Sequence, residues 1–169
     1  RVVPGITAAI GGLAYAGIPM THRATATAVT FVTGHNLYGQ VPDDLDWHAL
    51  VNGAQVLIFY MALKHIEEIV DRSVASGVRH CFLNTNHPSL KGGFSHYSGV
   101  TYDQSNEQYN QLIRDVHEGM VEKGKPVTLI DMERIWLSHL EKSSSLRSES
   151  LLLEDGIHLS EEGHLIYTD

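Results

Sequence analysis

Apolar and polar residues follow two spacings along this chain, and the two spacings alternate. Runs of consecutive apolar or β-branched residues, which are typical of strands, occupy residues 28–34, 54–61, 78–85 and 126–131. Between these runs, apolar residues recur at helical spacing over residues 63–76 and 105–122. This alternation predicts an α/β fold with a mostly parallel sheet and flanking helices.

Local signals mark several ends of these elements. Asp46 is placed to begin a helical turn in the sequence LDWHAL, and Gly77 ends the helix predicted over residues 63–76. The segment 138–150, SHLEKSSSLRSES, is rich in serine and charge, and we predict that it is a loop. A further helix is expected to begin shortly before the chain stops. The chain starts with arginine rather than methionine, so we expect both of its ends to be cut.

Residues 2–20 carry no charge, which raises the question of a membrane span. Pro4, Pro19 and four glycines interrupt the stretch, and its apolar side chains are mostly small, so we predict neither a membrane span nor a signal peptide. We predict instead a turn at Pro4 and then a helix that Thr7 caps and Gly17 ends.

Composition argues against several classes of function. Hydrophobic residues make up 43% of the 169 residues and charged residues 19%, which is globular composition. The formal net charge of −8 argues against a broad positive surface for nucleic acid and against a polybasic membrane patch. Cys81 is the single cysteine, which favours a reducing cytoplasm, and we interpret it as a small buried strand residue. The eleven histidines lack the spacing of a zinc motif, and no phosphate loop is present, so we predict no metal site.

The sequence DGIHLSEEGHLIY near the C-terminus places Asp155 three positions before His158. In a hydrolytic triad an aspartate orients the histidine, and the histidine acts as the base. The extended pattern resembles the final sequence block of the SGNH (GDSL-type) hydrolases, and FLNTNHP, YNQLIRDV and VTLID agree with that family in order. The resemblance covers about residues 77–169. It implies a flavodoxin-like α/β fold and ester hydrolysis, with Asp155 and His158 as catalytic residues.

The nucleophile of that chemistry is missing. Neither a G-D-S turn nor a G-x-N-D block occurs in the chain, so the pair is expected to retain little hydrolytic power. A structural alternative is that Asp155 caps the turn into the next helix, with Ser160 and Gly163 as ordinary helix-start residues.

The upstream segments VVPGITAAIGGLAYAGIPMTHR, VTFVTGH, LDW and VLIFYMAL resemble the uroporphyrinogen-III C-methyltransferases over about residues 1–76. This resemblance implies two α/β domains with S-adenosylmethionine between them. It also implies that Thr7, Ala8 and Met61 contact that cofactor, although Ala62 stands where the family has glycine. The structural alternative is a helix cap at Thr7 and core filling by Met61.

The PMTHR sequence lies at the family's crossing between domains, where His22 and Arg23 would face the acid groups of a tetrapyrrole. Packing or a surface ion pair is the structural alternative. The family's early glycine-rich segments do not occur here, and hydrolase-like sequence replaces its later cofactor-contacting segment. The sequence therefore predicts a composite of two incomplete segments, residues 1–76 and 77–169.

The resemblance to the methyltransferases is the more specific of the two, and it implies S-adenosylmethionine-dependent methyl transfer to uroporphyrinogen III, as in sirohaem and cobalamin synthesis. An ester hydrolase and an inactive or poorly folded α/β module are the alternatives. The expected partner is a small molecule, either a tetrapyrrole or an ester, and neither nucleic acid nor a membrane. A homodimer remains an open option.

Overall fold

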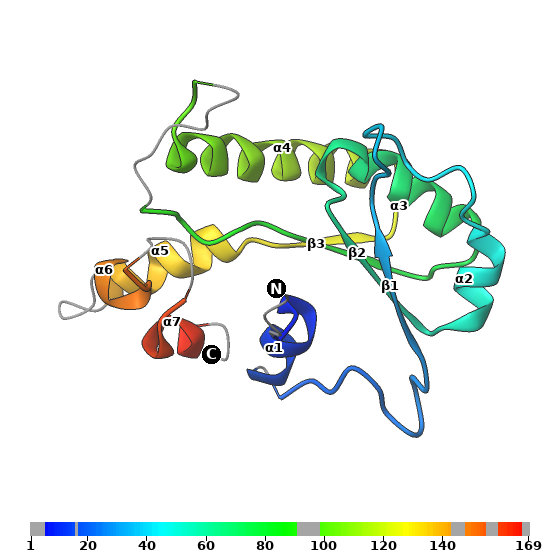
Figure 1. Ribbon diagram of the computed structural model, residues 1–169, viewed down its shortest axis with the longest axis horizontal. Helices are drawn as coiled ribbons and strands as arrows, with labels where there is room; N and C mark the ends of the chain where they lie inside the picture. Colours follow the sequence, from blue (N-terminus) through cyan, green and yellow to red (C-terminus); the bar gives the residue numbers. More distant parts are fainter. Residues whose placement is uncertain (1–5, 16, 91–98, 143–147, 155–158, 167–169) are drawn as a thin grey trace. The chain divides into compact units, whose positions relative to one another are not determined.

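The computed structural model describes residues 6–15, 17–90, 99–142, 148–154 and 159–166 of the chain (Figure 1). In chain order the elements are α1 (Ala8–Tyr15), β1 (Val29–Thr33), α2 (Trp47–Gly53), β2 (Val56–Tyr60), the 3₁₀ helix η1 (Leu63–His65), α3 (Ile66–Ala75), β3 (Cys81–Asn84), α4 (Tyr102–Glu122), β4 (Val127–Ile130), α5 (Met132–Lys142), α6 (Ser148–Leu151) and α7 (Glu161–Ile166). The predicted α/β class is confirmed. In the described residues the strands form two separate two-stranded sheets, β1–β2 and β3–β4.

The chain divides into two compact units. The first unit comprises Arg1–Cys81 and Glu118–Thr128, and the second comprises Phe82–His117 and Leu129–Asp169. Helix α4 and strands β3 and β4 each have residues in both units. The units therefore differ from the two segments, residues 1–76 and 77–169, that the sequence resemblances define. The boundary predicted between residues 76 and 77 separates two sequence resemblances, which the packing of the units does not test. It stays a prediction.

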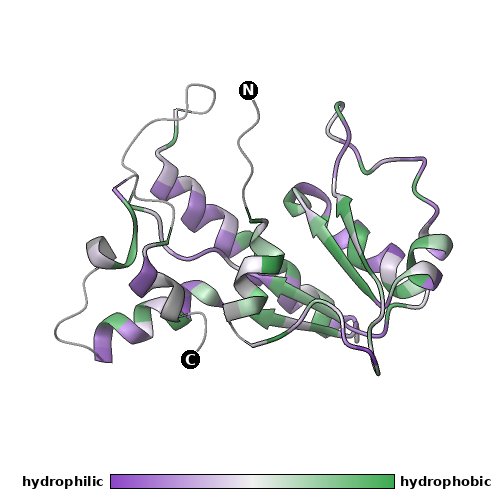
Figure 2. Ribbon diagram, turned by 60° about the horizontal axis from the view of Figure 1, so that its bottom comes forward, coloured by the Kyte–Doolittle hydropathy of each residue, from purple (hydrophilic) through white to green (hydrophobic). Residues whose placement is uncertain are grey.

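In the first unit, β1 and β2 form the parallel pair that their apolar runs predict. The register extends from Val29 opposite Val56 to Thr33 opposite Tyr60. Successive side chains of a strand point to opposite faces, and accordingly Val32 is buried while its neighbour Phe31 is 42% exposed. Figure 2 shows these strands largely in the green of hydrophobic residues.

Helices α2 and α3 contribute the core beside this sheet. Val41, Trp47 and Ile69 are buried together, and the partly buried Leu45, Phe59 and Ala62 pack against them. The Trp47 and Phe59 rings stack with their centroids 5.7 Å apart. Burial of one such aromatic side chain stabilises a fold by about 2–3 kcal/mol.

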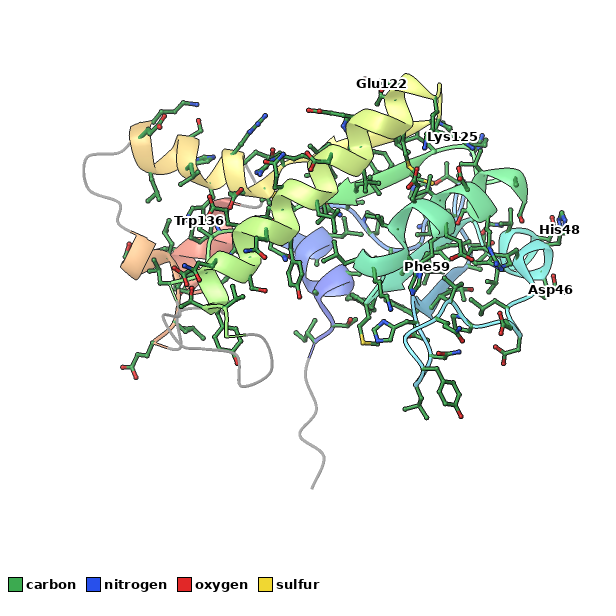
Figure 3. The ribbon with its side chains drawn as sticks, turned by 90° about the horizontal axis from the view of Figure 1, so that it is seen from above. Asp46, His48, Phe59, Glu122, Lys125 and Trp136 are labelled. Atoms are coloured by element: carbon green, nitrogen blue, oxygen red, sulfur yellow. The ribbon has the colours of Figure 1, made fainter. Side chains whose placement is uncertain are left out.

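The predicted ends of these helices are confirmed. Asp46 precedes α2, and its carboxylate accepts a hydrogen bond from the Ala49 amide at 2.9 Å (Figure 3). At the other end of the predicted 63–76 helix, Gly77 has a φ of +113°, which a residue with a side chain rarely adopts. The first turn of that segment is the 3₁₀ helix η1 rather than α-helix.

The segment that follows α4 is tied to α3 within the first unit. Lys123 pairs with Glu67, and Lys125 pairs with Asp71 at 2.7 Å. In β3, Cys81 donates its amide hydrogen to the Pro126 carbonyl, and the thiol is half-buried rather than fully buried. Desolvation by burial raises the pKa of this thiol.

In the second unit the Thr85 amide donates to the Ile130 carbonyl. Residue numbers therefore rise together on the two partners, from Cys81 with Pro126 to Thr85 with Ile130, as expected for parallel strands. Trp136, Leu151 and Leu152 form the core of this unit, with Leu140 and Leu159 packed against them.

The loop predicted for residues 138–150 is wrong at both ends, because α5 continues to Lys142 and α6 begins at Ser148. Asp131 starts α5 by accepting a hydrogen bond from the Arg134 amide at 3.2 Å. Met132 and Trp136, one turn apart, are both buried, so tertiary packing outweighs the serine-rich composition.

None of the described helices, including the 21-residue α4, combines the length and apolar character that a membrane crossing requires.

Candidate functional site

The candidate site lies where β2 ends beside the start of α1, and we call Thr7, Ala8, Tyr60 and Met61 the strand-end site. The Thr7 carbonyl accepts hydrogen bonds from the Ile10 and Gly11 amides, so Thr7 occupies the position just before the helix. Its side-chain hydroxyl bonds the Tyr60 phenol instead, at 2.6 Å. The same phenol oxygen accepts a hydrogen bond from the Ala9 amide at 2.9 Å. The cap predicted for the Thr7 side chain is therefore supplied by Tyr60.

Met61 follows Tyr60 and is accessible. Its side chain is 62% exposed, so the alternative of core filling is wrong. The backbone of Met61 has a φ of +53°, the left-handed conformation that costs a residue with a Cβ about 1–2 kcal/mol. Strained residues of this kind gather at ligand sites, where the surrounding structure holds them in place.

Gly34 at the end of β1 explains how the turn at Met61 is held. Its amide donates to the Tyr60 carbonyl at 2.6 Å. A Cβ at Gly34 would lie 2.5 Å from the Cα of Ala62, so the two backbones approach as only glycine permits. Ala62 itself has a φ of −91°, which any residue adopts, and its departure from the family's glycine costs no backbone strain.

The loop after Gly34 forms a pocket next to Met61. His35 donates a ring hydrogen bond to the Met61 carbonyl at 2.8 Å, and His65 donates one to the Gly39 carbonyl at 2.7 Å. The Asn36 side chain accepts hydrogen bonds from the Tyr38 and Gln40 amides and thereby closes the turn. An open pocket of about 450 Å³ is lined by His35, Asn36, Leu37, Gly39 and Met61.

These groups can hold and orient a ligand. Ala8 is exposed and Thr7 is half-buried, so a small side chain, a hydroxyl and the Met61 thioether are all accessible. A thioether gives a polarizable apolar contact, and a hydroxyl can donate and accept hydrogen bonds. Sequence reasoning placed Thr7, Ala8 and Met61 here by resemblance but missed Tyr60 and His35. Both lie within segments that carry the resemblance, Tyr60 in VLIFYMAL and His35 in VTFVTGH.

The basic residues expected near a tetrapyrrole lie on a tight turn. His22 and Ala26 pair through two backbone hydrogen bonds of 2.6 and 2.9 Å, and Arg23 is exposed at this turn. Their role toward acid groups of a substrate stays a prediction.

Asp155 and His158, the predicted hydrolase pair, lie outside the residues that the structure describes. Next to them, the Ser160 hydroxyl donates to the Ser150 carbonyl at 2.7 Å and accepts the Gly163 amide hydrogen at 3.1 Å. Ser160 therefore caps α7, as the structural alternative expected for this residue.

A second polar cluster lies in the second unit, and we call Arg114, Asp131, Glu133 and Thr85 the arginine network. The Arg114 guanidinium, whose side chain is 10% exposed, donates to both Asp131 oxygens at 2.8 Å and to Glu133. The Arg114 hydrogen bond holds the pKa of Asp131 at about 2. Thr85 donates to Asp131 and accepts from the Glu133 amide. Every charged member has a partner inside the network, which makes it a structural feature rather than a ligand site.

Within the described part of the chain, no three His, Cys, Asp or Glu side chains gather as metal ligands would.

Comparison with known proteins finds relatives for the N-terminal portion of the chain. Residues 1–83 match the model of the tetrapyrrole (corrin/porphyrin) methylases, so this part of the chain is similar to that family. A uroporphyrinogen-III C-methyltransferase of Sinorhizobium is 56% identical over 77 residues, which are 46% of this chain and 28% of that protein. One from Synechocystis is 42% identical over 78 residues, or 46% of this chain and 30% of that protein. The siroheme synthase of Chromobacterium violaceum is 50% identical over 77 residues, again 46% of this chain but 16% of that protein.

The chain thus spans less than a third of the length of these relatives. Among solved structures, a Clostridium thermocellum family 3 carbohydrate esterase aligns with a TM-score of 0.43 and 16% identity, over 83% of this chain and 51% of that one.

Proposed function

We propose that the strand-end site binds S-adenosylmethionine and that it serves methyl transfer to uroporphyrinogen III. The observation that carries this proposal is the exposed, left-handed Met61, joined through Tyr60 to Thr7. These residues lie within residues 1–83, which match the tetrapyrrole methylase model, and a protein named uroporphyrinogen-III C-methyltransferase is 56% identical to this chain over 77 residues.

The groups present suit an adenosyl sulfonium ligand. Met61 offers a soft apolar wall beside a pocket of about 450 Å³, and Ala8 lets a ligand approach the backbone closely. Thr7 keeps hydrogen-bonding capacity beyond its bond to Tyr60, because a hydroxyl has one donor and two acceptor sites. When bound, the cofactor supplies an electrophilic methyl group, and the residues of this chain hold and orient it.

Positioning is the main contribution that such a site makes to methyl transfer. Holding two reactants in line replaces an encounter in solution with a step inside one complex, which is worth up to about 7–11 kcal/mol of the barrier. Arg23 is exposed on a turn, and its guanidinium is suited to pair with a carboxylate of a tetrapyrrole.

Binding and turnover are separate expectations for this chain. The matching segment of 77 residues amounts to 28% of the Sinorhizobium relative, so the remainder of such an enzyme is needed to enclose both ligands. We therefore expect cofactor binding by this chain and little or no methyl transfer by it alone.

Titration calorimetry with S-adenosylhomocysteine tests the proposal. We expect saturable heat that Met61→Ala weakens about tenfold, since removal of one well-packed apolar contact costs about 1.4 kcal/mol or more. Leu137→Ala is the matched control, because Leu137 is an apolar side chain on α5, 46% exposed and outside the strand-end site. The absence of heat at millimolar ligand would contradict the proposal. Equal loss of affinity in Met61→Ala and Leu137→Ala would contradict it as well.

A further inference from the structure

We propose that Tyr60 is a positioning residue, whose phenol holds the Thr7–Ala8 segment against the Met61 turn and thereby assembles the strand-end site. The part of this inference that concerns a ligand rests on the proposed function. The part that concerns the anchoring of α1 stands on the hydrogen bonds alone.

One phenol oxygen makes both connections to the start of α1. It lies 2.6 Å from the Thr7 hydroxyl oxygen and 2.9 Å from the Ala9 nitrogen. The first amides of any helix lack partners within the helix, and a capping side chain normally comes from the adjoining residue. Here the partner comes from a strand more than fifty residues away in sequence, so the cap is also a tertiary tie.

Helix α1 depends on this tie. It has 8 residues with the sequence AAIGGLAY, and glycine is a much weaker helix former than alanine. So short a helix is not stable on its own in water. Among the described residues, the hydrogen bonds that tie α1 and the preceding Thr7 to a strand are the two that the Tyr60 phenol makes.

The Tyr60 ring is itself held firmly. It stacks on Phe31 of the neighbouring strand, with centroids 6.1 Å apart and planes 11° from parallel. The Tyr60 backbone pairs with Thr33 in the sheet register, and its carbonyl accepts the Gly34 amide hydrogen. The next residue is Met61, whose carbonyl is bonded by His35. The Tyr60 side chain is therefore fixed in position, and its phenol sets the placement of Thr7 relative to the Met61 turn.

The hydrogen-bond arrangement also prepares Thr7 for a ligand. The phenol oxygen accepts from the Ala9 amide, which leaves the Tyr60 hydroxyl hydrogen available to Thr7. When Tyr60 donates, Thr7 retains its own hydroxyl hydrogen and can offer it to an acceptor on the ligand. Loss of the phenol oxygen would free the Thr7 side chain to turn and would remove the donor that lets Thr7 keep its own hydroxyl hydrogen for a ligand.

Tyr60→Phe tests the inference, because it keeps the stacked ring and deletes the single oxygen. Tyr109→Phe is the matched control, since Tyr109 is 48% exposed on α4, outside the strand-end site and its pocket. Hydrogen exchange measures the amides of α1 without any ligand, and calorimetry with S-adenosylhomocysteine measures affinity. We expect Tyr60→Phe to accelerate exchange of the Ala9 amide about tenfold and to weaken ligand affinity about tenfold, because the deleted oxygen makes both hydrogen bonds at the start of α1.

A double-mutant cycle with Thr7→Val separates positioning from general loosening. If Tyr60 acts through Thr7, the double variant binds S-adenosylhomocysteine only slightly more weakly than either single variant. Unchanged exchange at Ala9 in Tyr60→Phe would overturn the anchoring role. Faster exchange with unchanged affinity, or fully additive losses in the cycle, would overturn the positioning role. If the unaltered chain binds no ligand, the proposed function fails, and the exchange experiment still decides whether Tyr60 anchors α1.

Discussion

The two polar clusters of this protein both follow strand ends, yet they differ in almost every physical respect. In the arginine network, the Arg114 side chain is 10% exposed and its charge is matched by Asp131 and Glu133. In the strand-end site, Met61 is 62% exposed and its backbone is held in a left-handed conformation beside an open pocket. The charges of the arginine network are paired with one another, whereas the strand-end site keeps accessible groups and a strained backbone at Met61. Polar residues at strand ends therefore indicate a ligand site only where they are still available to a ligand.

Removal of the arginine should have the largest effect on stability. Arg114→Leu removes the buried cation that Asp131 and Glu133 share and leaves Asp131 only the exposed Arg134. Breaking such a buried pair costs about 3–5 kcal/mol of unfolding free energy. Urea denaturation followed by circular dichroism measures this loss. Arg134→Leu is the control, because Arg134 also approaches Asp131, at 3.3 Å, but is 74% exposed, and its loss should cost less than about 1 kcal/mol. Similar losses in the two variants would show that the network is not structural.

The close approach at Gly34 should give the next largest effect. Gly34→Ala places a methyl group 2.5 Å from the Ala62 Cα, and a clash with backbone should cost about 3 kcal/mol and weaken S-adenosylhomocysteine binding. Gly53→Ala is the matched control, since nothing lies within 4 Å of its added Cβ. Thermal unfolding of the two variants makes the comparison. Equal melting temperatures would mean that the Met61 turn is not held by this approach.

Acid should weaken the arginine network specifically. The Arg114 hydrogen bond lowers the folded-state pKa of Asp131 to about 2, below its ordinary value. A depressed carboxyl pKa contributes stability above the unfolded-state pKa, and this contribution, about 2 kcal/mol here, is lost as the pH falls from about 4 to about 2. Unfolding free energies measured across that range should fall less steeply in Asp131→Asn. Parallel curves for the variant and the unaltered chain would contradict this assignment.

Relief of strain at Met61 should give the smallest effect and one of opposite sign. Met61→Gly removes the Cβ that disfavours a φ of +53°, so the free energy of unfolding should rise by up to about 1 kcal/mol. The same variant should bind S-adenosylhomocysteine more weakly, since the thioether is gone. Met61→Ala should lose affinity without gaining stability, because it keeps a Cβ. A less stable Met61→Gly would show that Met61 stabilises the fold rather than serving a ligand.

Much of the local structure could be predicted from the sequence because its causes are local. The parallel β1–β2 pair follows from two continuous apolar runs, and the start of α2 follows from the Asp46 side chain. Resemblance to the methyltransferases also brought Thr7 and Met61 into one hypothesis, and the hydrogen bond between Thr7 and Tyr60, the residue before Met61, supports their proximity.

The remaining features depend on residues far apart in the chain. Nothing near Thr7 reveals that Tyr60 will cap α1 in its place. The serine-rich segment 138–150 concealed the end of α5, because burial of Trp136 in that helix, which is 0% exposed, outweighs local propensity. The arginine network was also missed, since it joins α4 to residues around β3 and β4 that share no motif. The left-handed Met61 requires Gly34, which directly follows another strand, and no single segment encodes that turn.

The most direct test observes Met61 itself. The chain has four methionines, and Met61 is 62% exposed whereas Met120 and Met132 are 1% and 7% exposed. A carbon-13 methyl-methionine NMR spectrum, assigned by single substitutions, reports each of them during titration with S-adenosylhomocysteine. We predict a saturable shift of the Met61 signal while the Met120 and Met132 signals stay in place. A Met61 signal that does not move at millimolar ligand would contradict a cofactor site at the end of β2.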